Sequence, residues 1–142
     1  MAGNNKKSNA MVIASKVAKV NDLFRKANSK ELLKFDLTAP QFDSLLVIHT
    51  NGPIPLKRIS EELMVTGANI TCIIDNLEKM NYVKRVNSRE DRRVVLAELT
   101  SKGKDKVTKV LPDYLNRLAG VSNKLTQAEN KQLISILDKL LG

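Results

Sequence analysis

The amino-acid sequence predicts a mainly α-helical domain that carries one small β-hairpin. Along most of the chain, apolar residues recur at the three- and four-residue spacing of an amphipathic helix. Residues 82–99 break this pattern, because two β-prone runs, YVKRV and VVLAEL, flank a polar loop. Aromatic residues are few, with three Phe, two Tyr and no Trp, which favours an aliphatic core. A length of 142 residues fits a single compact domain.

The chain is expected to begin with a polar tail and a long helix. Residues 1–9 contain no hydrophobic stretch, and we expect them to form a disordered tail. Residues 10–34 then predict one amphipathic helix, whose apolar positions are Ile13, Val17, Val20, Phe24 and Ala27.

A second helix is expected to start after Thr38. This threonine can cap the helix, and Gln41 three residues later completes a capping box. Pro40 is tolerated in the first turn, and Gly52 ends the helix. Residues 54–56 follow as a brief extended link between prolines.

Two further helices are expected before the hairpin. The third is short, and Thr66 in the following VTGA turn caps the fourth. Asn81 is expected to end the fourth helix in a left-handed conformation. The apolar positions of the two helices are Leu56, Ile59, Leu63, Ile70, Ile73, Ile74, Leu77 and Met80.

The C-terminal part of the sequence predicts a long helical region and a final helix. Thr100 caps the long region, and Pro112 is expected to kink it or to mark a shift of its axis. Thr126 and Glu129 form a complete capping box for the final helix.

A short helix, a tight turn, a second helix and a two-stranded ribbon together predict a winged helix-turn-helix over residues 36–100, whose second helix enters the DNA major groove. The N-terminal half of the outward face of that helix is small and uncharged, although an ordinary surface helix would also explain its apolar stripe. The candidate DNA-binding residues on this face are Thr66, Ala68, Asn69, Thr71, Cys72 and Asn76.

The ribbon predicts a wing that presents arginine to a narrow minor groove. Asp91 lies two residues before Arg93 and can hold its guanidinium through a bidentate pair, so that the side chain is aimed before DNA arrives. The alternative is a hairpin tip that is charged only for solubility. The candidate DNA-binding residues of the wing are Arg85, Ser88, Arg89, Arg92 and Arg93, with Asp91 as their buttress.

Composition favours an anionic partner inside the cell. Lys and Arg outnumber Asp and Glu by 24 to 15, a formal charge of +9 that points first to nucleic acid and second to an acidic membrane surface. The single cysteine forms no intramolecular disulfide, which fits a reducing compartment. With neither a secretory signal nor a membrane-spanning run, we expect a cytoplasmic protein with no membrane association.

The segments TAPQFDSLLVI, ITCIIDNLEKMNYVKR and DRR followed by LAELTSKG resemble the MarR family of transcriptional regulators. The resemblance implies that Arg93 is the minor-groove residue and that Asp91 supports it. It also implies that residues 10–34 and 101–142 are dimerisation helices, so that residues 10–142 form one domain acting as a homodimer on a pseudo-palindromic operator. The alternative is that these helices fold back on their own core. Asn81 and Cys72 depart from the family, which favours glycine at the first position and a basic or small residue at the second.

The resemblance further implies a repressor that responds to a small aromatic or anionic effector. His49 is a candidate residue for the effector pocket, although an ordinary surface histidine is the favoured interpretation. Cys72 suggests an alternative regulator that responds to oxidants, and a protein-interaction module is the other alternative. The sequence shows no metal-ligand cluster, cofactor motif or catalytic constellation, so we expect no metal, no cofactor and no enzyme activity.

Overall fold

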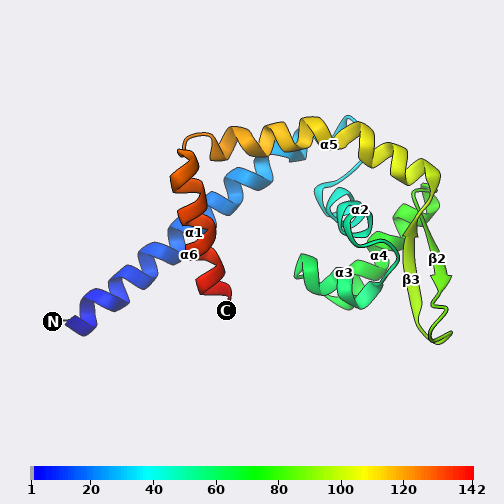
Figure 1. Ribbon diagram of the computed structural model, residues 1–142, viewed down its shortest axis with the longest axis horizontal. Helices are drawn as coiled ribbons and strands as arrows, with labels where there is room; N and C mark the ends of the chain where they lie inside the picture. Colours follow the sequence, from blue (N-terminus) through cyan, green and yellow to red (C-terminus); the bar gives the residue numbers. More distant parts are fainter. Residues whose placement is uncertain (1) are drawn as a thin grey trace. The chain divides into compact units, whose positions relative to one another are not determined.

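The computed structural model describes residues 2–142, which form six helices and three strands (Figure 1). The mainly helical class with a small β-wing is confirmed. The elements in chain order are α1 (Ala2–Leu33), α2 (Ala39–Asn51), β1 (Ile54–Pro55), α3 (Leu56–Leu63), α4 (Gly67–Lys79), β2 (Val83–Asn87), β3 (Val95–Leu99), α5 (Ser101–Ser122) and α6 (Gln127–Leu141).

The chain divides into two compact units. One unit is formed by Glu31–Pro112 and contains the winged helix-turn-helix. The other joins the N-terminal segment up to Lys30 with Asp113–Gly142. Pro112 lies inside the continuous helix α5, and the boundary between the units falls at this residue.

The core of the first unit lies where α2, α3 and α4 pack against the small sheet. The predicted capping box starts α2, since Gln41 N–H donates to Thr38 Oγ1 at 3.3 Å and Thr38 N–H donates to Gln41 Oε1 at 2.9 Å. Side chains from all three helices are fully shielded from solvent, and the largest of them are Phe42, Leu45, Ile48, Ile59, Ile70, Ile74 and Leu77. Burial of this aliphatic set is the main stabilising term of the unit.

The turn between α3 and α4 is fixed by two local features. Met64 ends α3 in a left-handed conformation with φ of 56°. Thr66 then caps α4, because its Oγ1 accepts the N–H of Asn69 at 3.1 Å. The turn therefore sets the direction in which α4 leaves the core.

The sheet has three antiparallel strands among the described residues, in the order β1-β3-β2. The sequence predicted Ile54 and Pro55 only as an extended link, but they pair with Ala97 and Leu96 of the hairpin. Strand β1 is only two residues long, so the sequence shows no alternating pattern of apolar and polar residues there. Whether these residues form a strand depends on their distant partner.

The base of the hairpin is tied to the start of α5. Asn81 ends α4 with φ of 63°, as predicted, and its carbonyl accepts a hydrogen bond from Thr100 Oγ1 at 2.6 Å. Thr100 Oγ1 in turn accepts the N–H of Gly103 at 3.0 Å. Gly103 is buried against the backbone of Tyr82, where there is no room for a β-carbon.

In the second unit, the long helix begins earlier than expected. Residues 1–9 were predicted to be disordered, but α1 starts at Ala2, and Met1 lies outside the described residues. Extending an existing helix fixes one residue per new hydrogen bond, so a polar run with no buried contacts can continue it. Asn28 links α1 to α5, because it donates to the Tyr114 carbonyl at 3.2 Å and accepts from Arg117 Nε at 2.6 Å.

Helix α6 is started by the predicted capping box. Thr126 Oγ1 accepts the N–H of Glu129 at 3.2 Å, and the Glu129 carboxylate accepts the N–H of Thr126 at 3.0 Å. Hydrogen bonds from the Thr126 backbone and side chain lower the pKa of Glu129.

No helix within residues 2–142 has both the length and the apolar character needed to cross a membrane.

Two glycines of α5, Gly103 and Gly120, allow a matched test of the close contact between Gly103 and the Tyr82 backbone. We expect Gly103→Ala to destabilise the fold by about 1–3 kcal/mol, because the new methyl group overlaps the Tyr82 carbonyl. Gly120→Ala meets no neighbouring atom within 4 Å and should be neutral or stabilising by up to about 1 kcal/mol. Thermal and urea unfolding measure both, and equal effects would contradict the close approach at Gly103.

Candidate nucleic-acid interface

Helix α4 separates an apolar inner face from a polar outer face. Its inner residues Ile70, Ile73, Ile74 and Leu77 are buried. The six predicted DNA-binding residues are all exposed, as expected from helical projection: Thr66, Ala68, Asn69, Thr71, Cys72 and Asn76. Small side chains let a backbone approach base edges closely, so this face is sterically suited to the major groove.

The polar atoms of this face differ in their availability. Thr66 is engaged as the helix cap, and Thr71 Oγ1 donates to the Gly67 carbonyl at 2.9 Å. The amide of Asn76 lies 4.0 Å from the Cys72 sulfur. These contacts leave the Asn69 amide and the amide oxygen of Asn76 as the groups best placed to exchange hydrogen bonds with a partner.

Arg85 lies apart from the other predicted wing residues. It is on β2, where its guanidinium contacts Asp75 at 2.6 Å and Glu78 at 3.3 Å, both on α4. Its side chain is only 28% exposed. Burial alone would lower the pKa of Arg85, but the hydrogen bond that Arg85 donates to Asp75 and the charges of Glu78 and Asp75 outweigh it and raise the pKa. The structure thus gives Arg85 a role in joining α4 to the wing, which the sequence pattern did not reveal.

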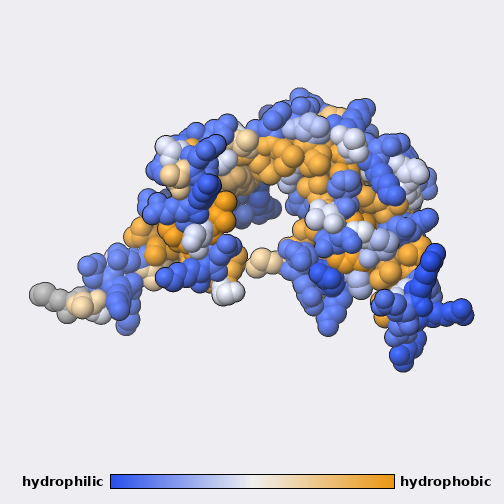
Figure 2. Space-filling view, in the orientation of Figure 1, coloured by the Kyte–Doolittle hydropathy of each residue, from blue (hydrophilic) through white to orange (hydrophobic). Residues whose placement is uncertain are grey.

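The loop between β2 and β3 is braced by its own hydrogen bonds. Ser88 N–H donates to the Val94 carbonyl, and Val94 N–H donates to the Asp91 carbonyl, both at 2.9 Å. Asn87 Nδ2 also donates to the Arg92 carbonyl at 2.9 Å. Figure 2 shows the resulting tip as strongly hydrophilic. A loop that is closed in this way holds its side chains in a defined direction.

The predicted pair between Asp91 and Arg93 is present. Arg93 Nε donates to Asp91 Oδ1 at 3.0 Å, and Arg93 Nη2 donates to Asp91 Oδ2 at 3.1 Å. The backbone N–H of Arg93 also donates to Oδ1, at 3.1 Å. Hydrogen bonds from the Arg93 side chain and then its backbone lower the pKa of Asp91. Arg93 is nevertheless 90% exposed, so its orientation is fixed while its outer surface stays open to a partner.

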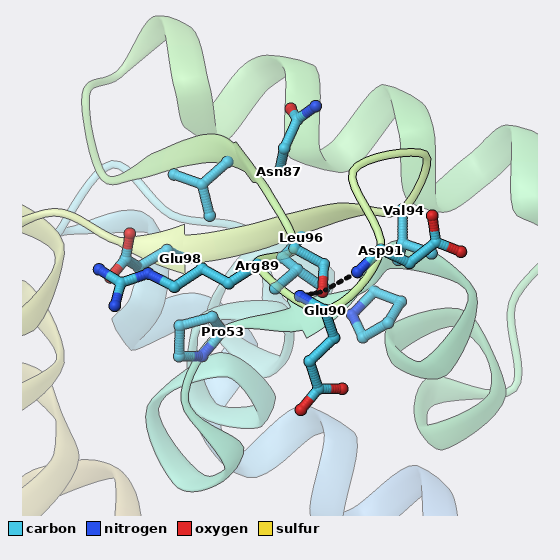
Figure 3. Close-up of a pocket in the computed structure, with 11 residues that line it drawn as sticks. Pro53, Asn87, Arg89, Glu90, Asp91, Val94, Leu96 and Glu98 are labelled. Carbon is cyan, nitrogen blue, oxygen red and sulfur yellow. Dashed lines mark hydrogen bonds between the residues drawn. The ribbon is translucent and has the colours of Figure 1, made fainter.

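A pocket of about 750 Å³ lies beside the wing (Figure 3). Its apolar lining comes from the hairpin, through Val86, Val94 and Leu96, and from Pro53 and Pro55 at and just before β1. Arg89, Glu90 and Asp91 project in different directions from its rim (Figure 3). Ser88 Oγ supports this rim by accepting the N–H groups of Glu90 at 3.3 Å and Asp91 at 3.5 Å.

His49 lies at the end of α2 and lines a second pocket, of about 420 Å³. The other lining residues include Lys104 and Thr108 of α5 and Glu98 of β3, which the sequence did not bring together with His49. Among residues 2–142, no cluster of three or more His, Cys, Asp or Glu side chains is arranged to hold a metal ion.

Comparison with known proteins agrees with this geometry. The model of the MarR family matches residues 37–95. The chain is 34% identical to the HTH-type transcriptional regulator YkoM of Bacillus subtilis over 70% of this chain and 64% of that protein. It is 33% identical to the regulator YfiV of the same organism over 78% of this chain and 71% of that protein.

Solved structures show the same fold. A cysteine-to-serine mutant of MarR from E. coli, complexed with operator DNA, matches with a TM-score of 0.84, 24% identity, and coverage of 94% of this chain and 96% of that chain. Bordetella bronchiseptica BpsR, from a study of how 6-hydroxynicotinic acid regulates its DNA binding, matches with a TM-score of 0.82, 20% identity, and coverage of 92% and 98%.

The pair between Asp91 and Arg93 can be tested without any ligand. We expect Arg93→Ala to raise the pKa of Asp91 part of the way toward its ordinary value of 3.8, because the two side-chain hydrogen bonds to the carboxylate are lost while the backbone N–H of residue 93 still donates to it. Arg92→Ala removes the same charge one residue away and should leave that pKa nearly unchanged. Carboxyl-detected NMR titration measures both variants. An Asp91 pKa that is insensitive to Arg93 would show that the pair does not form in solution.

Proposed function

The chain belongs to the MarR family of transcriptional regulators, and from this premise we propose that it is a sequence-specific DNA-binding repressor. It acts as a homodimer on a pseudo-palindromic operator, and a small ligand modulates its affinity. The observation that carries the proposal is Arg93, which is held in a fixed direction by Asp91 and is otherwise exposed.

In this function, α4 enters the major groove and the wing follows the neighbouring minor groove. Asn69 and Asn76 on α4 offer amide groups that pair with base edges. Arg93 is directed into the narrow minor groove, where negative potential is strongest. Because Asp91 orders the Arg93 side chain in advance, less conformational entropy is lost when DNA binds.

The homodimer is supported by apolar side chains that this chain leaves uncovered. Helix α6 has no buried residue, and its large apolar side chains are all exposed: Leu133, Ile134, Ile136, Leu137, Leu140 and Leu141. On α1 the exposed set includes Ile13, Val17 and Val20. A second copy of the chain covers these surfaces, and its twofold symmetry places two α4 helices about one DNA turn apart.

The His49 pocket is the site we propose for an effector. Lys104 and His49 provide a positive charge and an aromatic ring, which suit a small aromatic or anionic molecule. The pocket borders β3 through Glu98 and Leu99, so a ligand there contacts the strand that carries the wing. The BpsR study concerns a ligand that regulates DNA binding, which supports the proposal that a ligand modulates this protein.

Three wing variants test how the repressor holds DNA. Arg93→Ala should weaken operator binding by about 1–3 kcal/mol, the range for one good contact. Asp91→Ala should also weaken binding, because the freed Arg93 must then be ordered at the expense of entropy. Glu90→Ala removes the same negative charge from the next residue, without freeing Arg93, and should leave binding unchanged or slightly tighter. Fluorescence anisotropy at moderate salt measures all three.

The comparison of the two acids decides between mechanisms. If Asp91→Ala and Glu90→Ala both tighten binding, Asp91 is only a surface charge and does not orient the Arg93 side chain.

The salt dependence of DNA binding tests the alternative of a protein-interaction module. Such a module would bind duplex DNA weakly, and its affinity for DNA would not depend on salt. A DNA-binding protein should lose log affinity linearly with log salt, by about 0.9 per phosphate neutralised.

A double substitution that places charges on the apolar face of α6 tests the homodimer. Leu133 and Leu137 lie one turn apart on the apolar face of α6, and both are partly exposed. Changing both to Glu should dissociate the dimer or unfold the protein, because two charges are buried without partners. The control changes Gln132 and Ser135, on the polar face, to Glu. Light scattering should report a dimer for the control only, and a folded dimer in both variants would contradict the proposal.

A further inference from the structure

Four lysines of α1 form a basic stripe: Lys16, Lys19, Lys26 and Lys30. At 100° per residue they fall within about 80° of one another around the helix axis. All four are exposed. The stripe is about 21 Å long at 1.5 Å per residue. It lies beside the apolar positions Ile13, Val17 and Val20, which project to a separate arc of the same helix.

The excess positive charge of the protein is concentrated in the unit that contains this stripe. Residues 1–30 and 113–142 hold eleven Lys and Arg against four Asp and Glu, a net charge of +7. Residues 31–112, with the winged helix-turn-helix, hold thirteen against eleven, a net charge of +2. The overall charge of +9 therefore does not arise mainly from the recognition helix and wing.

Few acidic side chains of the described residues compensate the positive charge of the stripe. Lys26 pairs with Asp22 at 2.8 Å, while no ion pair joins Lys16, Lys19 or Lys30 to an acid of residues 2–142. Lys16 and Lys19 are three residues apart and Lys26 and Lys30 are four apart, so the like charges of each pair lie next to each other on the helix surface and repel each other. In α6, by contrast, two lysines are balanced by two acids.

We propose that the basic stripe of α1 is a second, sequence-independent binding surface for the phosphate backbone of duplex DNA. This proposal rests on the proposed DNA-binding function, which brings duplex DNA to the protein. Duplex DNA carries one negative charge per about 1.7 Å of its axis with both strands counted, so a length of duplex equal to the stripe carries about twelve phosphates, of which only those on the facing side can contact the four lysines. Lysine suits such a contact, because it acts as a mobile point charge with no requirement for a fixed geometry.

An anionic membrane is the competing partner for a basic amphipathic helix. Membrane binding requires the apolar face to enter the lipid boundary. In the proposed homodimer, that face is covered by the second copy of the chain, while the four lysines stay on a different arc. Phosphate contacts with DNA need only the lysines, so the proposed homodimer favours DNA over a membrane as the partner of the stripe.

The test neutralises the three stripe lysines that have no ion pair. The variant changes Lys16, Lys19 and Lys30 to Gln. The matched control changes Lys124, Lys131 and Lys139 to Gln, which removes three exposed charges from the same unit. Circular dichroism and light scattering check that both remain folded with the mass of the wild type. Anisotropy then measures binding to a selected operator and to an unrelated duplex of equal length, over a range of salt concentrations.

The stripe variant should bind both duplexes about tenfold more weakly at low salt, and the slope of log affinity against log salt should fall by about 2.7 for three lost contacts. The ratio of operator to unrelated affinity should stay constant, whereas Arg93→Ala should lower that ratio. Affinities equal to those of the control would overturn the stripe proposal and leave the proposed function intact. A wild type that binds neither duplex would overturn both. Binding of wild type to phosphatidylserine vesicles that excess duplex does not displace would assign the stripe to a membrane instead.

Discussion

The close contact between Gly103 and the backbone of Tyr82 is the constraint on which the position of the wing depends. Tyr82 is where the chain leaves α4 for the hairpin, and Gly103 is in the first turn of the helix that follows the hairpin. Thr100 closes the same junction by donating to Asn81 and accepting from Gly103. Lys102 adds a hydrogen bond to the Met80 carbonyl at 3.0 Å and lies over the Tyr82 ring. Both strands of the hairpin therefore leave from one rigid point.

A second set of contacts fixes the hairpin relative to α4. Arg85, the middle residue of the hairpin's outer strand β2, forms ion pairs with Asp75 and Glu78 of the helix. Strand β3 is held on its other side by the short strand β1. With the base and the outer strand both secured, the distance between the polar face of α4 and the tip of the wing is set before any DNA is present. Binding then requires little rearrangement of the protein, which lowers its entropic cost.

Features that depend on neighbouring residues were predictable from the sequence. The capping boxes at Thr38 and Thr126, the left-handed Asn81 and the pair between Asp91 and Arg93 each involve residues at most three positions apart, or a single backbone conformation. Features that depend on distant partners were missed. Strand β1 pairs with residues more than forty positions away, and Arg85 was grouped with the tip arginines because its acidic partners lie on another element. The helix over residues 2–9 was missed because its composition alone resembles a disordered tail.

The hydrogen bonds that shape the wing tip all lie within residues 87–94. None of them reaches α4, and none reaches the core. The conformation of the tip is therefore determined by its own residues, and we expect it to be unaffected by substitutions elsewhere in the chain. If α4 reads base edges as proposed, substitutions on its outer face would change the DNA sequence that is recognised without requiring any change at Asp91 or Arg93. The two parts of the proposed interface could then change independently of each other.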